Sequence, residues 1–186
     1  MPDPLSPPSE PPSDGTVVLR LRRAGDVAAI AEASHDPETL RWLEDEPTAP
    51  GPAESVARAA AHWRSGRRAP FVIADAATDA PLGLVNVQVA DDPEIASLAV
   101  SVFPQARGRG VAPRALRLAA AWALGGPGLQ RVVAEAAVDN TASIRAIEKA
   151  GFHREGVLRS HCRTHGRRHD CVMFSLVPED LPDLQS

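Results

Sequence analysis

Residues 104–112 read PQARGRGVA, so that two glycines, Gly108 and Gly110, alternate with two arginines, Arg107 and Arg109. The stretch lies between an apolar run over 95–103 and a long alanine-rich segment. Where a strand ends in closely spaced glycines before a helix, several backbone N–H groups stay unpaired beside the positive end of the helix dipole. Glycine also lets the backbone adopt positive φ and approach a phosphate closely, while arginine adds charge. The stretch therefore predicts an anion-binding loop, with a tight turn carrying solvated arginines as the alternative.

Two familiar nucleotide-binding motifs do not fit this loop. A Walker phosphate-binding loop needs Gly-Lys-Ser or Gly-Lys-Thr, and the only lysine of the sequence is Lys149. A dinucleotide fingerprint needs a third glycine, at the position where the sequence has Pro113. Neither of these nucleotide-binding motifs therefore describes the loop.

The segments around the loop alternate between strand and helix patterns. Short β-branched or apolar runs bounded by turn residues predict strands over 16–22, 70–75, 81–89, 95–103, 131–138, 156–163 and 169–177. Apolar residues at helical spacing, with capping residues at the ends, predict a helix capped by Asp26, a short one around 40–43, and others over 54–63, 113–125 and 141–150. Polar turns join the second strand to the third, and the sixth to the seventh, as hairpins.

The chain length of 186 residues suits one domain with a single core. The first sixteen residues contain six prolines and almost no apolar side chains, so they cannot repay the entropy of ordering. We therefore predict a disordered proline-rich leader over 1–16 and a single domain over 17–186.

Composition excludes several classes of protein. No stretch combines a basic region with an apolar one as a signal peptide does, and no run approaches eighteen apolar residues, so we expect a cytoplasmic protein without a membrane partner. The formal net charge of −4 argues against a general nucleic-acid binder. Two cysteines are too few for an oxidised scaffold, so Cys162 and Cys171 are expected to be reduced thiols. If Gly166 and Arg167 formed the tip of the last hairpin, these cysteines would lie opposite each other, and a disulfide would be geometrically conceivable.

A second motif accompanies the glycine loop. Residues 139–156 read DNTASIRAIEKAGFHREG, with an N-x-x-S pattern followed by K-x-G-F and E-G. Gln105, Gly108 and Gly110 match the Q/R-x-x-G-x-G/A cofactor loop of the Gcn5-related N-acetyltransferase (GNAT) family. The second motif resembles the ribosomal-protein N-terminal acetyltransferase (RimJ/RimL-like) branch of that family, and the weaker likeness extends from Val17 to Leu176.

This resemblance implies a fold and a cofactor. The fold is an α/β (α+β) GNAT fold, with a mixed, mostly antiparallel sheet of about seven strands, flanking helices, and a splay between the fourth and fifth strands. The cofactor is acetyl-CoA, whose pantetheine arm would lie in that splay, held by the side-chain amide of Asn140. Asn140 is also a good helix N-cap, and the two roles are compatible. The residues expected to bind the cofactor are Val102, Gln105, Arg107, Gly108, Arg109, Gly110, Val111, Ala112, Asn140 and Ser143.

The resemblance also implies a reaction, in which an uncharged amine attacks the thioester while backbone N–H groups near 100–103 stabilise the oxyanion. A protonated amine has no lone pair to donate, so a base must accept its proton. Relatives often place an acidic residue where this sequence has Ser97, and the related branch can place a glutamate where it has Cys162. Glu135 and His161 remain as candidates for the base, and imidazole has the better intrinsic chemistry for the task.

The departing thiolate must be protonated again. Many family members use a tyrosine seven residues after the asparagine, but that position is Ile147 and the chain has no tyrosine. The related branch points instead to Ser143, which could equally be an ordinary first-turn helix residue. The histidines at 161, 165 and 169 recur every fourth residue, but they surround a predicted hairpin, so no metal site is expected.

Two functions remain open. The first is an N-acetyltransferase whose acceptor amine belongs to a small molecule or a protein N-terminus, with a homodimer as an open assembly. The second is an acyl-CoA-binding sensor that keeps the loop but has lost its acid and base. The missing tyrosine and glutamates favour the sensor, whereas Asn140 and Ser143 favour the enzyme. Because positioning alone can accelerate attack on a reactive thioester, loss of one proton relay need not abolish turnover, and the enzyme is preferred.

Overall fold

A computed structural model describes residues 5–42 and 51–181 of the chain. Its main elements, in chain order, are β1 Val17–Arg20, α1 Val27–Ser34, α2 Pro37–Trp42, α3 Pro52–Arg64, β2 Arg68–Asp75, β3 Pro81–Val89, β4 Ile95–Val102, α4 Val111–Gly125, β5 Arg131–Ala137, α5 Thr141–Lys149, β6 His153–Thr164 and β7 Arg167–Leu176.

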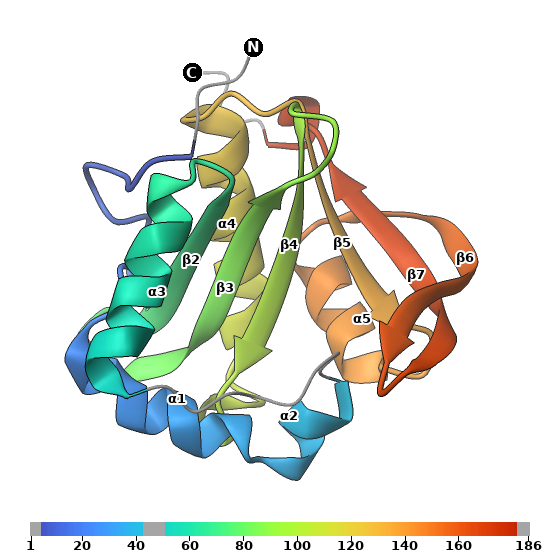
Figure 1. Cartoon of the computed structure of the whole chain (residues 1–186). Helices are drawn as coiled ribbons and strands as arrows, with labels where there is room; N and C mark the ends of the chain where they lie inside the picture. The colour runs from blue at the N-terminus through green and yellow to red at the C-terminus, as the bar shows by residue number, and fades with distance from the viewer. Residues whose placement is uncertain (1–4, 43–50, 182–186) are drawn as a thin grey trace.

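The strands form one seven-stranded sheet in the order β1-β2-β3-β4-β5-β7-β6. The pair β4 and β5 is parallel, and the other neighbouring pairs are antiparallel. Figure 1 shows α4 and α5 behind the sheet, α3 in front of β2, and α1 and α2 across the end at which β4 finishes. This arrangement confirms the predicted fold class.

Most predicted elements occur within a few residues of their expected bounds. The hairpin of β2 and β3 is present, and α4 begins two residues before Pro113, which therefore lies in the first helical turn as expected. The first strand is shorter than predicted and ends at Arg20. Leu43, expected in the short second helix, lies outside the described residues.

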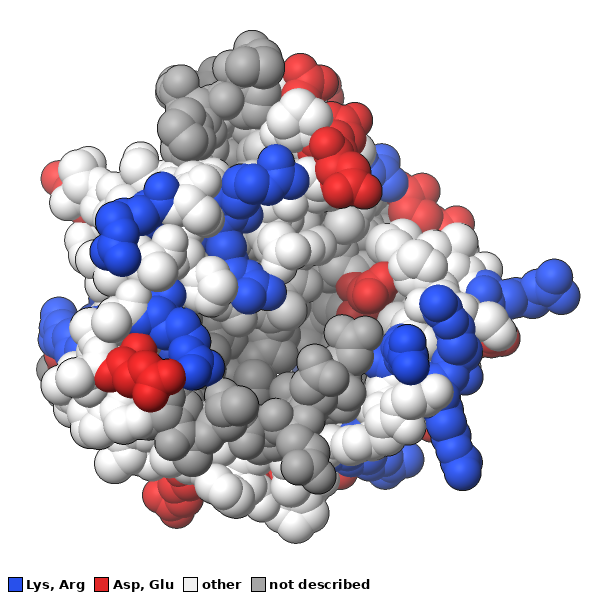
Figure 2. Space-filling model, in the orientation of Figure 1, with Lys and Arg blue, Asp and Glu red and all other residues white. Residues whose placement is uncertain are grey.

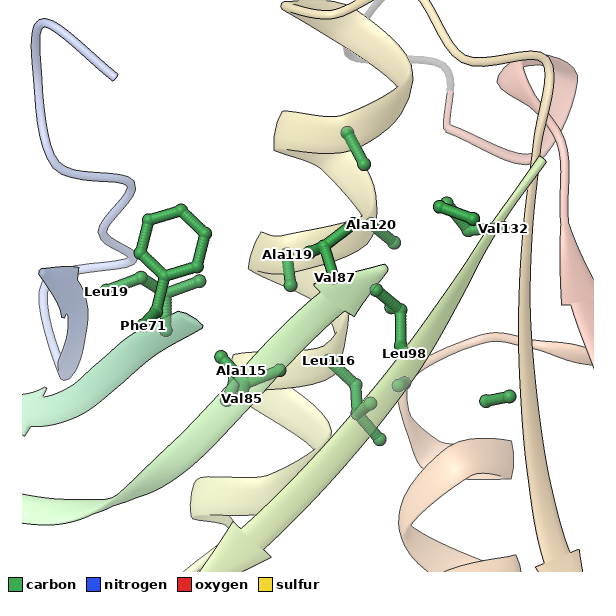
Figure 3. Close-up of a cluster of buried hydrophobic side chains, with 14 of the residues drawn as sticks. Leu19, Phe71, Val85, Val87, Leu98, Ala115, Leu116, Ala119, Ala120 and Val132 are labelled. Atoms are coloured by element: carbon green, nitrogen blue, oxygen red, sulfur yellow. The ribbon is translucent and has the colours of Figure 1, made fainter. Parts of the chain in front are cut away.

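The core lies between the sheet and α4. A stripe of small and aliphatic residues on α4 is buried, comprising Ala115, Leu116, Ala119, Ala120 and Ala123. Figure 3 shows several of these side chains facing Phe71, Val87 and Leu98 from three different strands. Burial of one leucine or phenylalanine side chain contributes about 1.5–3 kcal/mol. The alanines let α4 approach the sheet closely, and this fixes the position of its N-terminus.

Asp26 does more than begin α1. Its carboxylate is buried, accepts the Arg23 N–H at 2.7 Å and forms an ion pair with the buried Arg20 at 2.8 Å. Arg20 also contacts Asp79 at 2.6 Å, in the turn between β2 and β3. Asp26 is the N-cap residue of α1 as predicted, but its carboxylate accepts no N–H of α1 and instead ties β1 to the turn that follows it.

The segment over 5–16 differs from the predicted disordered leader. Leu5 is 1% exposed and belongs to the main core, and its N–H donates to the Gly66 carbonyl at 2.8 Å. The Leu19 N–H donates to the Pro12 carbonyl, and Ser13 pairs with Val18. Residues 5–16 therefore lie against the domain in this structure, held by one buried leucine and by the edge of β1, although their composition indicates disorder.

The cysteines also depart from expectation. Cys162 and Cys171 form a disulfide between β6 and β7, with Cα atoms 5.9 Å apart, so the prediction of reduced thiols is wrong for this structure. The hairpin turns at His165 and Gly166, which places Cys162 opposite His169 and Cys171 opposite Leu158. The disulfide therefore joins positions that are not direct partners in the sheet.

Within residues 5–42 and 51–181, no helix is both long enough and apolar enough to cross a membrane.

Candidate active site

The strands β4 and β5 part along their length. They pair in parallel only between Ile95–Leu98 and Arg131–Ala134, although β4 continues to Val102 and β5 to Ala137. Figure 1 shows the two ribbons diverging toward the end that carries α2. The splay implied by the family resemblance is therefore present.

Hydrogen bonding decides which main-chain groups face this opening. The Phe103 N–H donates to the Leu82 carbonyl at 2.8 Å, on the β3 side of β4. Because main-chain groups alternate between the two edges of a strand, Val100 and Val102 direct their N–H and carbonyl groups toward β5. Beyond Leu98 no residue of β5 pairs with them. Of the expected oxyanion donors near 100–103, Phe103 is thus already used within the sheet, while Val100 and Val102 remain available.

The glycine loop has the backbone conformation that the sequence predicts. Gly108 and Gly110 have φ of +73° and +74°, in the left-handed region that favours glycine. A Cβ atom added at either position would meet no heavy atom within 4 Å. The space beside both residues is therefore open, and Gly110 is the N-cap of α4.

The loop also presents unused donors. The Arg107 N–H donates to the Pro104 carbonyl at 3.3 Å, so Arg107 leaves the expected set of main-chain donors. Within the described part of the chain, the N–H groups of the next five residues donate to no side chain and to no main-chain carbonyl outside α4. These residues are Gly108, Arg109, Gly110, Val111 and Ala112. These donors lie at the positive end of the α4 dipole and fit a diphosphate.

The two loop arginines do different things. The Arg107 guanidinium donates to Asp36 Oδ2 at 2.5 Å and to Thr39 Oγ1 at 2.9 Å, and so ties the loop to α2. Hydrogen bonds from Arg107 and from the Thr39 N–H lower the pKa of Asp36 to about 2. Arg109 is exposed, as is Gln105. Arg109 is therefore better placed than Arg107 to add charge at the rim of the loop.

Asn140 and Ser143 lie together at the start of α5. Asn140 Oδ1 accepts the Ser143 N–H at 3.1 Å, so Asn140 is the N-cap of the helix. Within the described ranges, the Asn140 amide nitrogen and the Ser143 hydroxyl have no hydrogen-bond partner. The cap and a second role for the Asn140 amide are therefore compatible.

The two candidates for the base contact each other. The Glu135 side chain points away from the α4 face, because its neighbours Ala134 and Ala136 are buried on that face. His161 Nε2 lies 3.1 Å from Glu135 Oε2, and both side chains are close to half exposed. The sequence named the two residues as alternatives and gave no signal of their contact, since β7 lies between their strands.

The face that carries Glu135 is open to solvent. Figure 2 shows this face hollowed between its two sides, with basic side chains on both. On the floor of the sheet, the Ser97 hydroxyl donates to the Gln88 carbonyl at 3.4 Å. The position where relatives carry an acid is therefore occupied by a group that bonds within the sheet.

Comparison with known proteins agrees with this geometry. Residues 16–153 match the family model described as an acetyltransferase (GNAT) domain. The chain belongs to the GNAT family. Among curated proteins, this GNAT domain is 31% identical to the mycothiol acetyltransferase of Rhodococcus erythropolis (strain PR4 / NBRC 100887) over 157 residues, which are 82% of the chain and 47% of that protein. The chain spans less than half the length of the curated relatives it matches.

Solved GNAT structures share the fold. RimJ from Mycobacterium smegmatis, in complex with CoA-disulfide, superposes with a TM-score of 0.78 at 23% identity, covering 89% of this chain and 84% of that one. Ribosomal-protein-S5-alanine acetyltransferase from Vibrio fischeri superposes with a TM-score of 0.75 at 18% identity, covering 89% and 94%. At these identities the likeness shows the fold alone, and both names belong to the branch that the sequence motif resembles.

Proposed function

We propose that the chain transfers an acetyl group from acetyl-CoA to a primary amine, by direct attack of the amine in a ternary complex. The family gives the general reaction. The observation that carries the proposal is the series of unused main-chain donors over 108–112, which lies next to the opening between β4 and β5.

The residues present fit acetyl-CoA. The donors of the loop suit its diphosphate, and the free N–H groups of Val100 and Val102 suit an extended, amide-bearing pantetheine arm, whereas the Val102 carbonyl already accepts Arg107 Nε at 3.3 Å. The amide nitrogen of Asn140 is a further donor. When bound, acetyl-CoA supplies an acyl thioester, and the Val100 and Val102 N–H groups are the strand donors available to a developing oxyanion.

The Glu135 and His161 pair is the proposed proton acceptor. Its carboxylate and imidazole contact each other on the open face of the sheet, and the imidazole can take the proton of the amine directly or through a water molecule. The Ser143 hydroxyl is the proposed proton donor to the departing thiolate. The contact supports the enzyme over the sensor, because it supplies a base that the Ser97 and Cys162 positions lack.

The acceptor stays open between a small amine and a protein N-terminus. A homodimer and a cytoplasmic location stay predictions.

Thiol release from acetyl-CoA across a panel of amines and peptides tests the proposal. Ser143→Ala is expected to lower kcat by at least about tenfold, as loss of a general acid does, and to change the Kd of acetyl-CoA by a smaller factor. Asn140→Asp keeps the cap acceptor but removes the amide donor, and should raise that Kd. Ser65→Ala, at an exposed serine beyond the end of α3, is the control and should match the parent.

One outcome would reverse the assignment. Tight binding of acetyl-CoA with no thiol release on any acceptor would support the sensor.

A further inference from the structure

The strand β6 is irregular beside the candidate base. Leu158 lies opposite Cys171 and Cys162 lies opposite His169, so three residues of β6, at 159–161, face the single residue Asp170 of β7. A bulge of this kind bends a strand and re-aims a side chain. Here the re-aimed side chain is that of His161.

The bulge lies where β6 brings His161 within reach of Glu135. Their strands are not neighbours, because β7 lies between β5 and β6. Adjacent strands are about 4.8 Å apart, so residues two strands apart are separated by about 10 Å at the backbone. Nevertheless, His161 Nε2 and Glu135 Oε2 approach to 3.1 Å. The bulge therefore carries His161 across β7.

Three side chains of β7 hold the bulge. Asp170 Oδ1 accepts the Ser160 N–H at 2.8 Å. The Arg168 guanidinium donates to the Ser160 carbonyl at 3.3 Å and to the His161 carbonyl at 3.2 Å. The disulfide between Cys162 and Cys171 fixes the residue that follows His161.

The backbone of the bulge needs this support. Ser160 has φ of +52°, in the left-handed region that non-glycine residues rarely adopt. Such a conformation costs on the order of 1 kcal/mol or more and persists only where the surroundings hold it. A bulge on the edge of a sheet, at an exposed position, would otherwise relax.

We propose that Asp170, Arg168 and the Cys162–Cys171 disulfide form a clamp that positions His161 against Glu135. Asp170 and Arg168 are positioning residues, since they act on His161 through hydrogen bonds to the backbone of the bulge. Among residues 5–42 and 51–181, the charged side chains of other strands that contact the bulge are those of Glu135 from β5 and of Arg168 and Asp170 from β7. The kinetic part of this inference rests on the proposed function, whereas the geometric part does not.

A double-mutant cycle separates positioning from general stability. Asp170→Ala should lower kcat about tenfold, since misplacement of a reacting group by about 1 Å costs up to about a hundredfold. In a His161→Ala background, the same change should lower kcat less than about twofold, because nothing remains to be positioned. Asp170→Asn keeps an oxygen that accepts the Ser160 N–H and should restore most of the parent rate.

The disulfide is tested separately. The combined change Cys162→Ser and Cys171→Ser should also lower kcat in the parent and not in the His161→Ala background. An equal loss in both backgrounds, for this variant and for Asp170→Ala, would overturn the clamp.

A readout without activity tests the geometry. In the parent, Glu135→Gln should change the imidazole 15N resonances of His161, because the carboxylate contacts Nε2. In the Asp170→Ala background, Glu135→Gln should leave the His161 resonances unaltered. In the Asp170→Asn background, Glu135→Gln should change these resonances as it does in the parent. Unaltered resonances in the parent, or equal changes in all three backgrounds, would overturn the inference even for a chain that releases no thiol. A parent that lacks thiol release but shows these shifts would refute the proposed function and leave the clamp supported.

Discussion

At the scale of single residues, Gly108 and Gly110 decide the character of the candidate cofactor site. Both adopt positive φ, and both leave open space where a side chain would be. The sequence predicted this loop correctly, because a strand, two close glycines and a helix are neighbours in the chain and need no distant contact to define them. It gave no signal of the contact between Arg107 and Asp36, because Asp36 lies far away in the sequence.

Gly110→Ala should weaken the binding of CoA. Alanine in a left-handed conformation costs about 1 kcal/mol or more. The alanine at position 110 therefore either keeps this conformation and destabilises the folded chain, or leaves it and rotates its N–H away from the ligand. We expect the Kd of CoA to rise at least about fivefold, which corresponds to about 1 kcal/mol, in a calorimetric titration. Gly25→Ala is the control, because Gly25 also has open space around its Cβ position but has no positive φ. An unchanged Kd for Gly110→Ala would contradict the role assigned to the loop.

At the scale of elements, α2 is held at the mouth of the site from two directions. Arg107 of the loop contacts Asp36 and Thr39 at the start of α2. On the other side, His165 Nε2 lies 2.9 Å from the Leu40 carbonyl, which links α2 to the tip of the β6 and β7 hairpin. A six-residue helix with no buried side chain gains little from packing, so these polar contacts fix its place.

The contact between Asp36 and Arg107 should make stability depend on pH in acid. The pKa of Asp36 is about 2 in the folded chain, below its ordinary value of 3.8. The folded state therefore binds fewer protons than the unfolded state between these values, and the contribution of Asp36 is present above about pH 4 and lost as the pH falls toward 2. The difference in urea midpoint between the parent and Asp36→Asn should be constant from pH 5 to 7 and shrink below pH 4.

Asp91→Asn is the control for the loss of one negative charge, because Asp91 is exposed. If the difference in urea midpoint between the parent and Asp36→Asn stayed constant down to pH 2.5, the contact between Asp36 and Arg107 would be contradicted.

At the scale of the whole molecule, the domain includes more of the chain than composition suggests. Leu5 belongs to the same core as Leu19 and Phe71, and residues 12–13 pair with the start of the sheet. A proline-rich segment cannot fold alone, but it can lie against an edge that is already formed. The described part of the leader is therefore an extension of the domain.

Leu5→Ala should destabilise the chain by about 2–4 kcal/mol, as loss of a buried leucine does, because Leu5 is 1% exposed. Urea unfolding followed by tryptophan fluorescence measures the change. The matched control is Leu21→Ala, at a leucine that is 43% exposed, and it should cost much less. If Leu5→Ala lowered the free energy of unfolding no more than Leu21→Ala does, residues 5–16 would not pack on the domain in solution.

The sequence by itself determined the glycine loop, the stripe of α4, the cap at Asn140 and the family, because each depends on residues close together in the chain. Tertiary structure decided the contact of His161 with Glu135, the pairing of Cys162 with Cys171 and the burial of Leu5. The first two join segments whose approach is set by strand order and by an irregular bulge, and the third places Leu5 in a core built from distant segments of the chain. Periodicity and spacing carry no record of such approaches, since they arise only when the whole sheet has formed.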